Sequence, residues 1–123
     1  VADQLRYGIS VAIFPEATST DGSEVKPFKR GLLTAAKLSG VDILPLCINY
    51  THFNGQPLDQ RNRDSIFYYG EMSFLSHLMR LLRAQSIRAE LKILNPVAAI
   101  LTTEDDAAEI VYEQVRSGFV PVT

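Results

Sequence analysis

An apolar segment that ends at a proline, followed by a helical pattern and a second apolar segment, most constrains the fold of this chain. Residues 9–14 form a β-rich apolar run that Pro15 terminates, and residues 42–50 form the second run. Between them, residues 27–39 carry apolar side chains at helical spacing, and Gly40 supplies a C-terminal stop. A strand, helix, strand order requires a right-handed crossover between parallel strands. The sequence therefore predicts an α/β fold with a mostly parallel sheet and flanking helices.

The remaining sequence predicts a single domain over residues 1–123, a length that can bury its own core. Its further elements are, in order, a surface loop at 54–63, a strand at 65–69, a helix at 73–83, a strand at 87–94 and a final helix ending near residue 117. Thr103 and Asp106 resemble a capping box that opens the last helix.

Composition excludes several classes of protein. Hydrophobic residues make up 46% of the chain and charged residues 21%, with a formal charge of -2, so neither disorder nor nucleic-acid binding is favoured. No apolar segment approaches the roughly 20 residues that span a bilayer, and no signal peptide opens the chain. The single Cys47 lies in an apolar run and is expected to be a small buried hydrophobe. Cys and His residues are too few and scattered to predict a metal site.

Two adjacent cations are the first candidate binding residues. Lys29 and Arg30 fall in the first turn of the predicted helix, where the positive end of the macrodipole disfavours cations. A bound anion would offset this cost, with the hydroxyls of Thr18 and Ser19 as further donors. The alternative is that both cationic side chains simply extend into water.

Glu16 is the second candidate, because it directly follows Pro15 at the end of the first predicted strand. Its carboxylate is suited to holding the cationic groups in position or to accepting hydrogen bonds from a substrate hydroxyl. A salt bridge to Lys29 or Arg30 without any ligand explains it equally well.

Three blocks in this region occur in a fixed order: Phe14-Pro15-Glu16-Ala17-Thr18-Ser19, Pro27-Phe28-Lys29-Arg30-Gly31 and Ile43-Leu44-Pro45-Leu46-Cys47-Ile48. Together they resemble consecutive blocks of the lysophosphatidic acid (1-acylglycerol-3-phosphate) acyltransferase family. The resemblance is strongest over residues 8–50. Residues 69–72 look like a less specific downstream block of bacterial members.

The resemblance implies a role in phospholipid biosynthesis. An acyl group would pass from acyl-CoA or acyl-carrier protein to the hydroxyl of a lysophospholipid, without a cofactor, at the cytoplasmic side of a membrane. The substrate-binding residues carried over are Phe14, Pro15, Glu16, Ala17, Thr18, Ser19, Lys29 and Arg30.

Two positions depart from the family pattern. Ala17 replaces the usual Gly, which leads us to expect a backbone without a positive φ at this position. Ser19 stands where most members have Arg, so a bidentate phosphate contact is exchanged for a weaker hydroxyl. Either phosphate binding leans on Lys29 and Arg30, or the acceptor differs.

The catalytic pair of the family is absent. Members resemble one another in a His-x-x-x-x-Asp block, whose His acts as general base. Here Pro57 stands five positions after His52, and Leu82 stands five after His77. We interpret the first histidine as a loop residue and the second as a helix-surface residue. The resemblance thus implies the C-terminal part of an acyltransferase domain, inactive alone, with its catalytic pair upstream of a chain that begins without Met.

Other interpretations stay open at this point. A degenerate, non-catalytic acyltransferase-like domain or a phosphate-binding α/β module fits the same pattern, although no glycine-rich nucleotide loop is present. The apolar helix at 73–83 is either a core helix or one that contacts a membrane peripherally. Sheet edges left open by a partial domain predict self-association.

Overall fold

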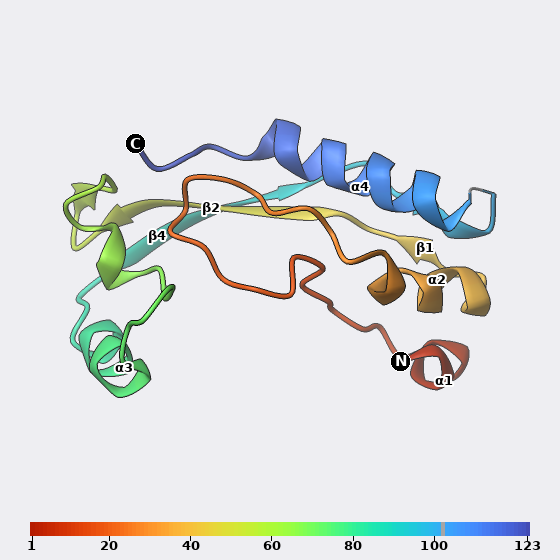
Figure 1. Cartoon of the computed structure of the whole chain (residues 1–123), viewed down its shortest axis with the longest axis horizontal. Coiled ribbons are helices and arrows are strands. Elements are labelled where there is room, and N and C mark those ends of the chain that lie inside the picture. Colours follow the sequence, from red (N-terminus) through yellow and green to blue (C-terminus); the bar gives the residue numbers. More distant parts are fainter. Residues whose placement is uncertain (102) are drawn as a thin grey trace.

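The computed structural model describes residues 1–101 and 103–123. Figure 1 shows an elongated α/β arrangement, with a long helix beside the central strands and shorter helices toward the two ends. The elements are α1 (Ala2–Arg6), η1 (Arg30–Leu32), α2 (Thr34–Ser39), β1 (Asp42–Ile43), β2 (Leu46–Phe53), β3 (Gln56–Pro57), η2 (Arg63–Ser65), α3 (Phe74–Leu82), β4 (Ile87–Ile93), β5 (Val97–Ala98), η3 (Ala99–Leu101) and α4 (Glu104–Gly118).

The strands are antiparallel, so the prediction of a mostly parallel sheet is wrong for the described residues. The larger sheet has the order β3-β2-β4, and β1 pairs with β5 in a separate two-stranded ladder. In the larger sheet, the longer ladder joins β2 to β4 and runs from Leu46 opposite Ile93 to Phe53 opposite Ile87. The mixed α/β class is confirmed, but the strand–helix–strand crossover is not formed.

The crossover is missing because its first strand is missing. Residues 9–14 lie in an extended segment that is assigned to no strand, and Ile9 and Phe14 are exposed. An apolar run becomes a strand only when another strand completes its hydrogen-bond ladder. The predicted helix at 27–39 is also divided into the three-residue η1 and the six-residue α2, which ends at Gly40 with φ 66° as expected.

The second half of the chain agrees better with the sequence. The predicted helix at 73–83 and strand at 87–94 appear as α3 and β4. Thr103 caps α4 by accepting the backbone N–H of Asp106 at 3.1 Å, which confirms the N-cap half of the predicted capping box, while its hydroxyl donates to the Asp106 carboxylate at 2.6 Å. The predicted strand at 65–69 is wrong, since Ser65 ends the short η2 and residues 66–69 form a turn and an irregular segment. There the ring of Phe67 lies over Gly22, so close that a Cβ at this glycine would be 2.5 Å from the ring.

The main core lies where α4 crosses β1 and β5. The buried side chains of Val97, Ala107 and Val111 form it, and the half-buried Phe28 and Ile43 pack against them. This cluster is small for a chain of this length, and much apolar surface remains outside it.

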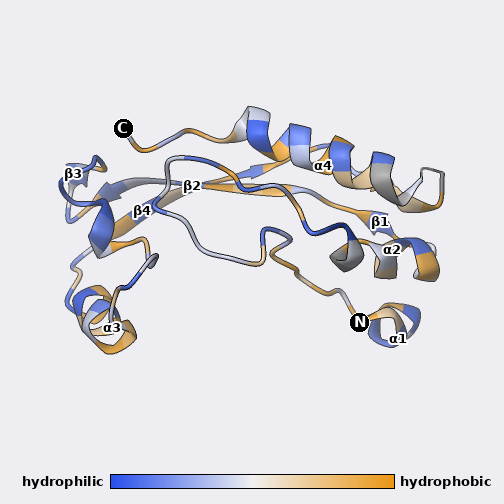
Figure 2. Cartoon of the chain, viewed as in Figure 1, coloured by the Kyte–Doolittle hydropathy of each residue, from blue (hydrophilic) through white to orange (hydrophobic). Residues whose placement is uncertain are grey.

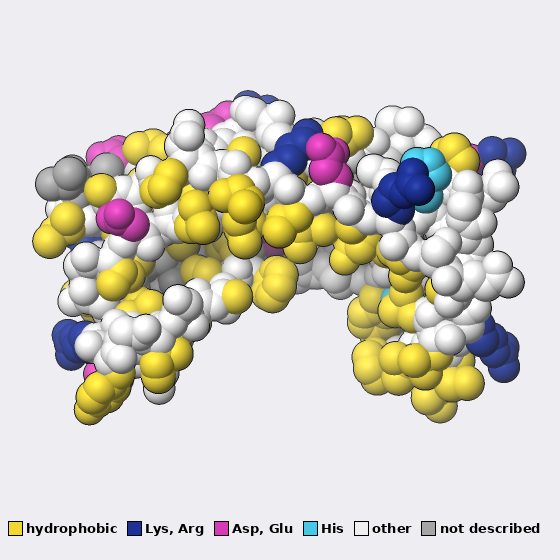
Figure 3. All heavy atoms as spheres, turned by 180° about the vertical axis from the view of Figure 1, so that it is seen from behind, with side chains coloured by type: hydrophobic (Ala, Val, Ile, Leu, Met, Phe, Trp, Pro, Cys, Tyr) yellow, Lys and Arg dark blue, Asp and Glu magenta, His cyan; other side chains and the backbone are white. Residues whose placement is uncertain are grey.

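One face of the β2–β4 sheet is covered by α4 and the following chain, and the other is open. Cys47 and Asn49 point to the covered face and are buried, as expected for Cys47. Side chains alternate along a strand, so their neighbours point the opposite way. The open face carries exposed apolar side chains of two cross-strand pairs, Leu46 with Ile93 and Ile48 with Leu91. Figure 3 shows this side of the molecule hollowed and largely apolar.

Among the residues that the structure describes, no helix has the length and apolar character needed to cross a bilayer. Figure 2 shows the apolar residues concentrated in the central strands and in one side of α3. Self-association through an open sheet edge stays a prediction; β4 is one of the two edge strands of its sheet, opposite the short β3.

Candidate functional site

Two hydrogen bonds bring the first two sequence blocks together. The backbone N–H of Lys29 donates to the carbonyl oxygen of Pro15 at 2.7 Å. The backbone N–H of Lys26 donates to the Oε2 of Glu16, also at 2.7 Å. The chain between these residues therefore forms a closed loop, and Glu16 and Lys29 lie at its two ends.

Phe28 anchors the second block to the core. Its ring meets the ring of Tyr112 on α4 edge to face, with centroids 5.3 Å apart. The hydroxyl of Tyr112 donates to the carbonyl oxygen of Val25 at 3.4 Å. The neighbouring Lys29 and Arg30 are exposed. A half-buried aromatic residue therefore fixes the position of two cations that reach the surface.

The backbone at Ala17 is in the left-handed region, with φ 54°, so the expectation of a negative φ is wrong. The N–H of Ala17 donates to the carbonyl oxygen of Phe14 at 3.1 Å, closing a tight turn immediately after the apolar run. This turn reverses the chain toward Thr18. The family's glycine therefore corresponds to a position that needs this conformation, and the alanine adopts it at a cost of about 1–2 kcal/mol.

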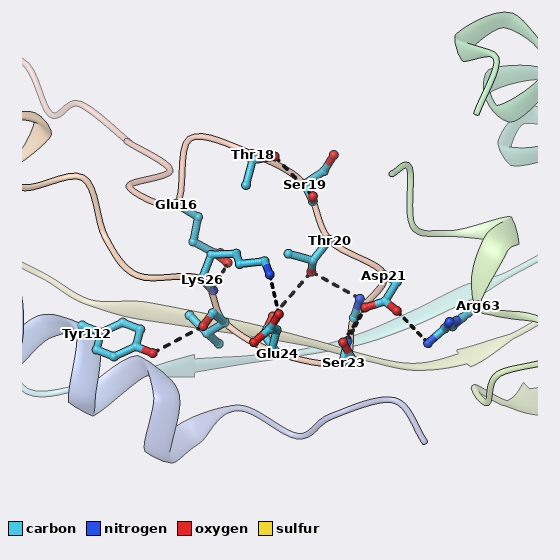
Figure 4. Close-up of polar contacts among 12 residues, drawn as sticks. Glu16, Thr18, Ser19, Thr20, Asp21, Ser23, Glu24, Lys26, Arg63 and Tyr112 are labelled. Atoms are coloured by element: carbon cyan, nitrogen blue, oxygen red, sulfur yellow. Dashed lines mark hydrogen bonds and ion pairs between the residues drawn. The ribbon is translucent and has the colours of Figure 1, made fainter. Parts of the chain in front are cut away.

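Thr18 and Ser19 are exposed on the loop. The hydroxyl of Thr18 donates to the carbonyl oxygen of Ser19 at 3.4 Å. Figure 4 shows both side chains on the outer part of the loop, whereas the Glu16 side chain points inward to Lys26. The structure therefore leaves the two hydroxyls accessible but does not bring them to the Glu16 carboxylate.

Glu16 serves first as a structural acceptor. Its bond goes to the backbone of Lys26, and no ion pair between Glu16 and Lys29 is recorded among the described residues. The Nζ of Lys26 contacts Glu24 instead, and the pKa of Lys26 is raised, first by its hydrogen bond to that carboxylate and then by the negative charge. This bond braces the chain segment that leads to Lys29 and Arg30, and a direct role of Glu16 toward the cations or a substrate stays a prediction.

The helix-terminus argument for the two cations is weaker than the sequence suggested. Lys29 caps η1, a turn of only three residues, and the α-helix begins at Thr34. A macrodipole develops only over aligned turns of helix, so a three-residue turn contributes little. An anion bound by Lys29 and Arg30 would be held by their own charges.

The sequence did not predict an ion pair that holds the middle of the loop, at Asp21, against Arg63. The Oδ2 of Asp21 lies 3.0 Å from the Nη1 of Arg63, and both side chains are largely shielded. Ser23 donates to the other carboxylate oxygen of Asp21 from its hydroxyl at 2.6 Å and its N–H at 3.0 Å. These hydrogen bonds, and then the Arg63 charge, lower the pKa of Asp21. No sequence signal linked residues 42 positions apart, although Asp21-Gly22 does indicate the turn.

Neither histidine occupies the environment that the sequence predicted. His52 lies within β2, opposite Pro57, and not in a loop. His77 is buried, 6% exposed, on the inner side of α3 beside the ring of Tyr68, and not on the helix surface. Its Nδ1 has no hydrogen-bond partner. The sequence places no Asp five positions after either histidine, so the chain contains no His-x-x-x-x-Asp block.

The described part of the chain contains neither a group of residues arranged to bind a metal ion nor an activated thiol. No group of three His, Cys, Asp or Glu residues there has the geometry to hold an ion. Burial raises the pKa of the Cys47 thiol, which favours the unreactive protonated form. The loop of residues 14–30 therefore remains the candidate site.

Comparison with known proteins gives a family match in the N-terminal part of the chain. The Acyltransferase family model matches residues 1–49, which include the whole loop. The lyso-ornithine lipid O-acyltransferase of Pseudomonas aeruginosa is 34% identical over 97 residues, covering 79% of this chain and 35% of that protein. The enzyme of the same name from Brucella abortus is 29% identical over 125 residues, covering 95% of this chain and 47% of that protein.

A second group of relatives matches a shorter segment. The 1-acyl-sn-glycerol-3-phosphate acyltransferase of Escherichia coli is 44% identical over 43 residues, 35% of this chain and 18% of that protein. No solved structure gives a significant match. The chain belongs to the acyltransferase family. It spans less than half of the length of these curated relatives.

Proposed function

We propose that this chain forms the acceptor-binding part of a lysolipid O-acyltransferase. The observation that carries the proposal is the 2.7 Å hydrogen bond from Lys29 to Pro15, which joins the two family blocks in one closed loop. This loop presents the cations Lys29 and Arg30 at one end and the hydroxyls of Thr18 and Ser19 along its outer part. Acidic headgroups are recognised by such a combination of charge and hydroxyl donors. The acceptor would lie against Glu16, Thr18, Ser19, Lys29 and Arg30, with Phe14, Pro15 and Ala17 shaping the turn.

The reaction would be an acyl transfer from a thioester, either acyl-CoA or acyl-carrier protein, and no cofactor is required. The acceptor hydroxyl attacks the thioester carbonyl, an ester C–O bond forms, the C–S bond breaks, and the hydroxyl proton ends on the leaving thiol. A general base must accept that proton first. Because the chain has no His-x-x-x-x-Asp block, this base would come from outside it, and the 123 residues would show no turnover alone.

A lyso-ornithine lipid is the favoured acceptor over 1-acyl-sn-glycerol-3-phosphate. The relatives named for the former match 73–95% of this chain, whereas those named for the latter match 35%. An ornithine headgroup carries one carboxylate together with a side-chain ammonium, in place of a doubly charged phosphate. Such a headgroup needs less positive charge, which agrees with a serine at position 19 where an Arg would make a bidentate contact. The enzyme would work at the cytoplasmic surface of a membrane, where its lipid substrates reside.

A segment exchange tests the proposal. This chain would replace the aligned segment of the Pseudomonas aeruginosa enzyme, and acyl transfer to each of the two acceptors would be measured. We expect the ornithine acceptor to be preferred. Lys29→Ala removes a charged contact and should cost about 1.5–3 kcal/mol in transition-state binding. Ser19→Arg should shift the preference toward the phosphate acceptor.

Matched controls separate the site from general damage. Lys37→Ala removes a half-buried charge outside the loop, on α2, and should change the rate with neither acceptor. If Lys29→Ala and Ser19→Arg behave like Lys37→Ala in a folded, active exchange protein, the acceptor does not contact this loop. Turnover by the 123-residue chain alone, abolished by His77→Gln, would instead place a catalytic base within it.

A further inference from the structure

Helix α3 presents most of its apolar side chains to solvent. Its buried residue is His77, and Leu78 and Leu81 are half-buried beside it. The exposed apolar side chains, which we call the α3 face, are Phe74, Leu75, Met79 and Leu82, with exposed fractions of 63%, 66%, 43% and 70%. Positions 75, 79 and 82 follow helical spacing and form one stripe. The interpretation of this segment as a core helix is therefore wrong for these side chains.

The surroundings of the α3 face are cationic. From residue 72 to residue 89 the sequence contains Arg80, Arg83 and Arg88 and no Asp or Glu. Both Arg80 and Arg83 line an open groove of about 640 Å³ between α3 and the end of β2, together with the apolar Leu75 and Met79. Figure 3 shows apolar side chains gathered over this helix with a cationic group at the margin.

The attachment of α3 leaves this face outward. The Nη1 of Arg80 donates to the backbone carbonyl of Asp64 at 3.0 Å, and the ring of Tyr68 contacts both Phe74 and His77. These contacts come from the η2 side of the helix. Figure 1 shows α3 projecting at one end of the molecule, away from α4 and from α1.

We propose that the α3 face docks on the surface of an anionic lipid bilayer. A helix with an apolar stripe and adjoining arginines lies in the interface with the stripe in the acyl boundary and the cations among the headgroups. Anionic lipid attracts each such cation by about 1 kcal/mol. A second copy of the chain fits less well, because it would carry the same arginines, Arg80 and Arg83, beside its own stripe and supply no anionic groups to neutralise them. Binding of the α3 face to a bilayer requires no catalytic residue and can be measured without acyl transfer. Its test is therefore independent of the proposed function.

A tryptophan substitution supplies a local reporter, because the chain contains no Trp. Leu82→Trp would place an indole on the α3 face, and Leu38→Trp would place one at an equally exposed leucine of α2. With vesicles of equimolar phosphatidylglycerol and phosphatidylcholine, we expect a blue shift for the α3 reporter and quenching by brominated lipid. The α2 reporter should show neither.

Point variants test the two forces separately in vesicle co-sedimentation. Arg83→Gln should weaken partitioning to anionic vesicles about fivefold, the factor that corresponds to 1 kcal/mol per cation. Leu75→Gln should weaken it about tenfold through lost apolar burial. Their matched controls, Arg6→Gln and Leu38→Gln, change an exposed arginine and leucine elsewhere and should bind as the unaltered chain does. Circular dichroism confirms that each variant is folded.

Three outcomes would overturn the proposal. One is equal quenching of the α2 and α3 reporters. Another is binding that depends neither on phosphatidylglycerol nor on ionic strength. The third is a blue shift of the α3 reporter that appears without vesicles as protein concentration rises and coincides with dimer formation by size exclusion, which would assign the face to a second copy.

Discussion

The carboxylate of Glu16 accepts the backbone N–H of Lys26 across ten residues of chain, at 2.7 Å. Together with the bond from Lys29 to Pro15, this contact sets the width of the candidate acceptor loop. The sequence alone predicted that Glu16 contacts a substrate or the cations. The structure shows that its carboxylate holds the two sides of the loop together.

Replacing Glu16 separates its acceptor role from its charge. Glu16→Gln keeps an oxygen that can accept the Lys26 N–H, whereas Glu16→Ala removes it. We expect amide hydrogen exchange at Lys26 to accelerate by roughly fivefold to tenfold in the alanine variant, in line with a hydrogen bond of about 1 kcal/mol. The glutamine variant should stay close to the unaltered chain. Equal acceleration in both variants would mean that the negative charge, and not the acceptor oxygen, maintains the loop.

Ala17 offers a stabilising substitution. Its φ of 54° is unfavourable for a residue with a Cβ, and glycine adopts it without that cost. After the greater entropy of an unfolded glycine is subtracted, Ala17→Gly should stabilise the chain by roughly 0.5–1 kcal/mol. Urea unfolding measures the difference, and Ala84→Gly, at a half-buried position where no positive φ is recorded, is the control that should not stabilise. A lower urea midpoint for Ala17→Gly would contradict the backbone assignment.

Asn49 ties the sheet to the end of α4. It is 2% exposed, its Nδ2 donates to the carbonyl oxygen of Gly118 at 3.0 Å, and its Oδ1 accepts the N–H of Val120 at 2.9 Å. Asn49→Ala should destabilise the chain by about 2–3 kcal/mol, because the Val120 N–H loses its partner in a partly buried setting. Denaturant unfolding measures this loss. The exposed Asn95 supplies the control Asn95→Ala, which should change stability by less than about 0.5 kcal/mol.

Acid should weaken the link between Asp21 and Arg63. The pKa of Asp21 is lowered from its ordinary value of 3.8 by the Ser23 hydrogen bonds and then by the Arg63 charge. Because the folded pKa lies below the unfolded one, the stabilisation is complete above the unfolded value and is lost as pH falls through the folded value. Unfolding free energies measured from about pH 5 to about pH 2 should fall less steeply in Asp21→Asn than in the unaltered chain. Parallel curves for the two proteins would exclude a contribution from this carboxylate.

The local parts of the fold were predictable because their signals are local. The apolar spacing of α3, the alternation of β4 and the Thr103 cap of α4 each depend on residues within a few positions of one another. The exposure of the α3 face could not be predicted from the spacing of its apolar residues, because the same spacing occurs in core helices and in interfacial helices.

The candidate site was predictable in its residues but not in its geometry. Ordered blocks identified Glu16, Lys29 and Arg30, and the comparisons support the family to which those blocks belong. The helix-terminus role of Lys29 was not borne out, since η1 is a single short turn. The positive φ of Ala17 ran against the preference of alanine, because the turn at Phe14 requires it.

By itself, the sequence determined the family, the absence of a His-x-x-x-x-Asp block, and the positions of α3, β4 and α4. Only the tertiary structure decided the direction of the strands, the burial of His77 and the brace between Glu16 and Lys26. The physical reason is distance along the chain. A strand's direction depends on which segment completes its hydrogen-bond ladder, and a side chain's burial depends on what packs over it. Neither partner is encoded in the residues next to it.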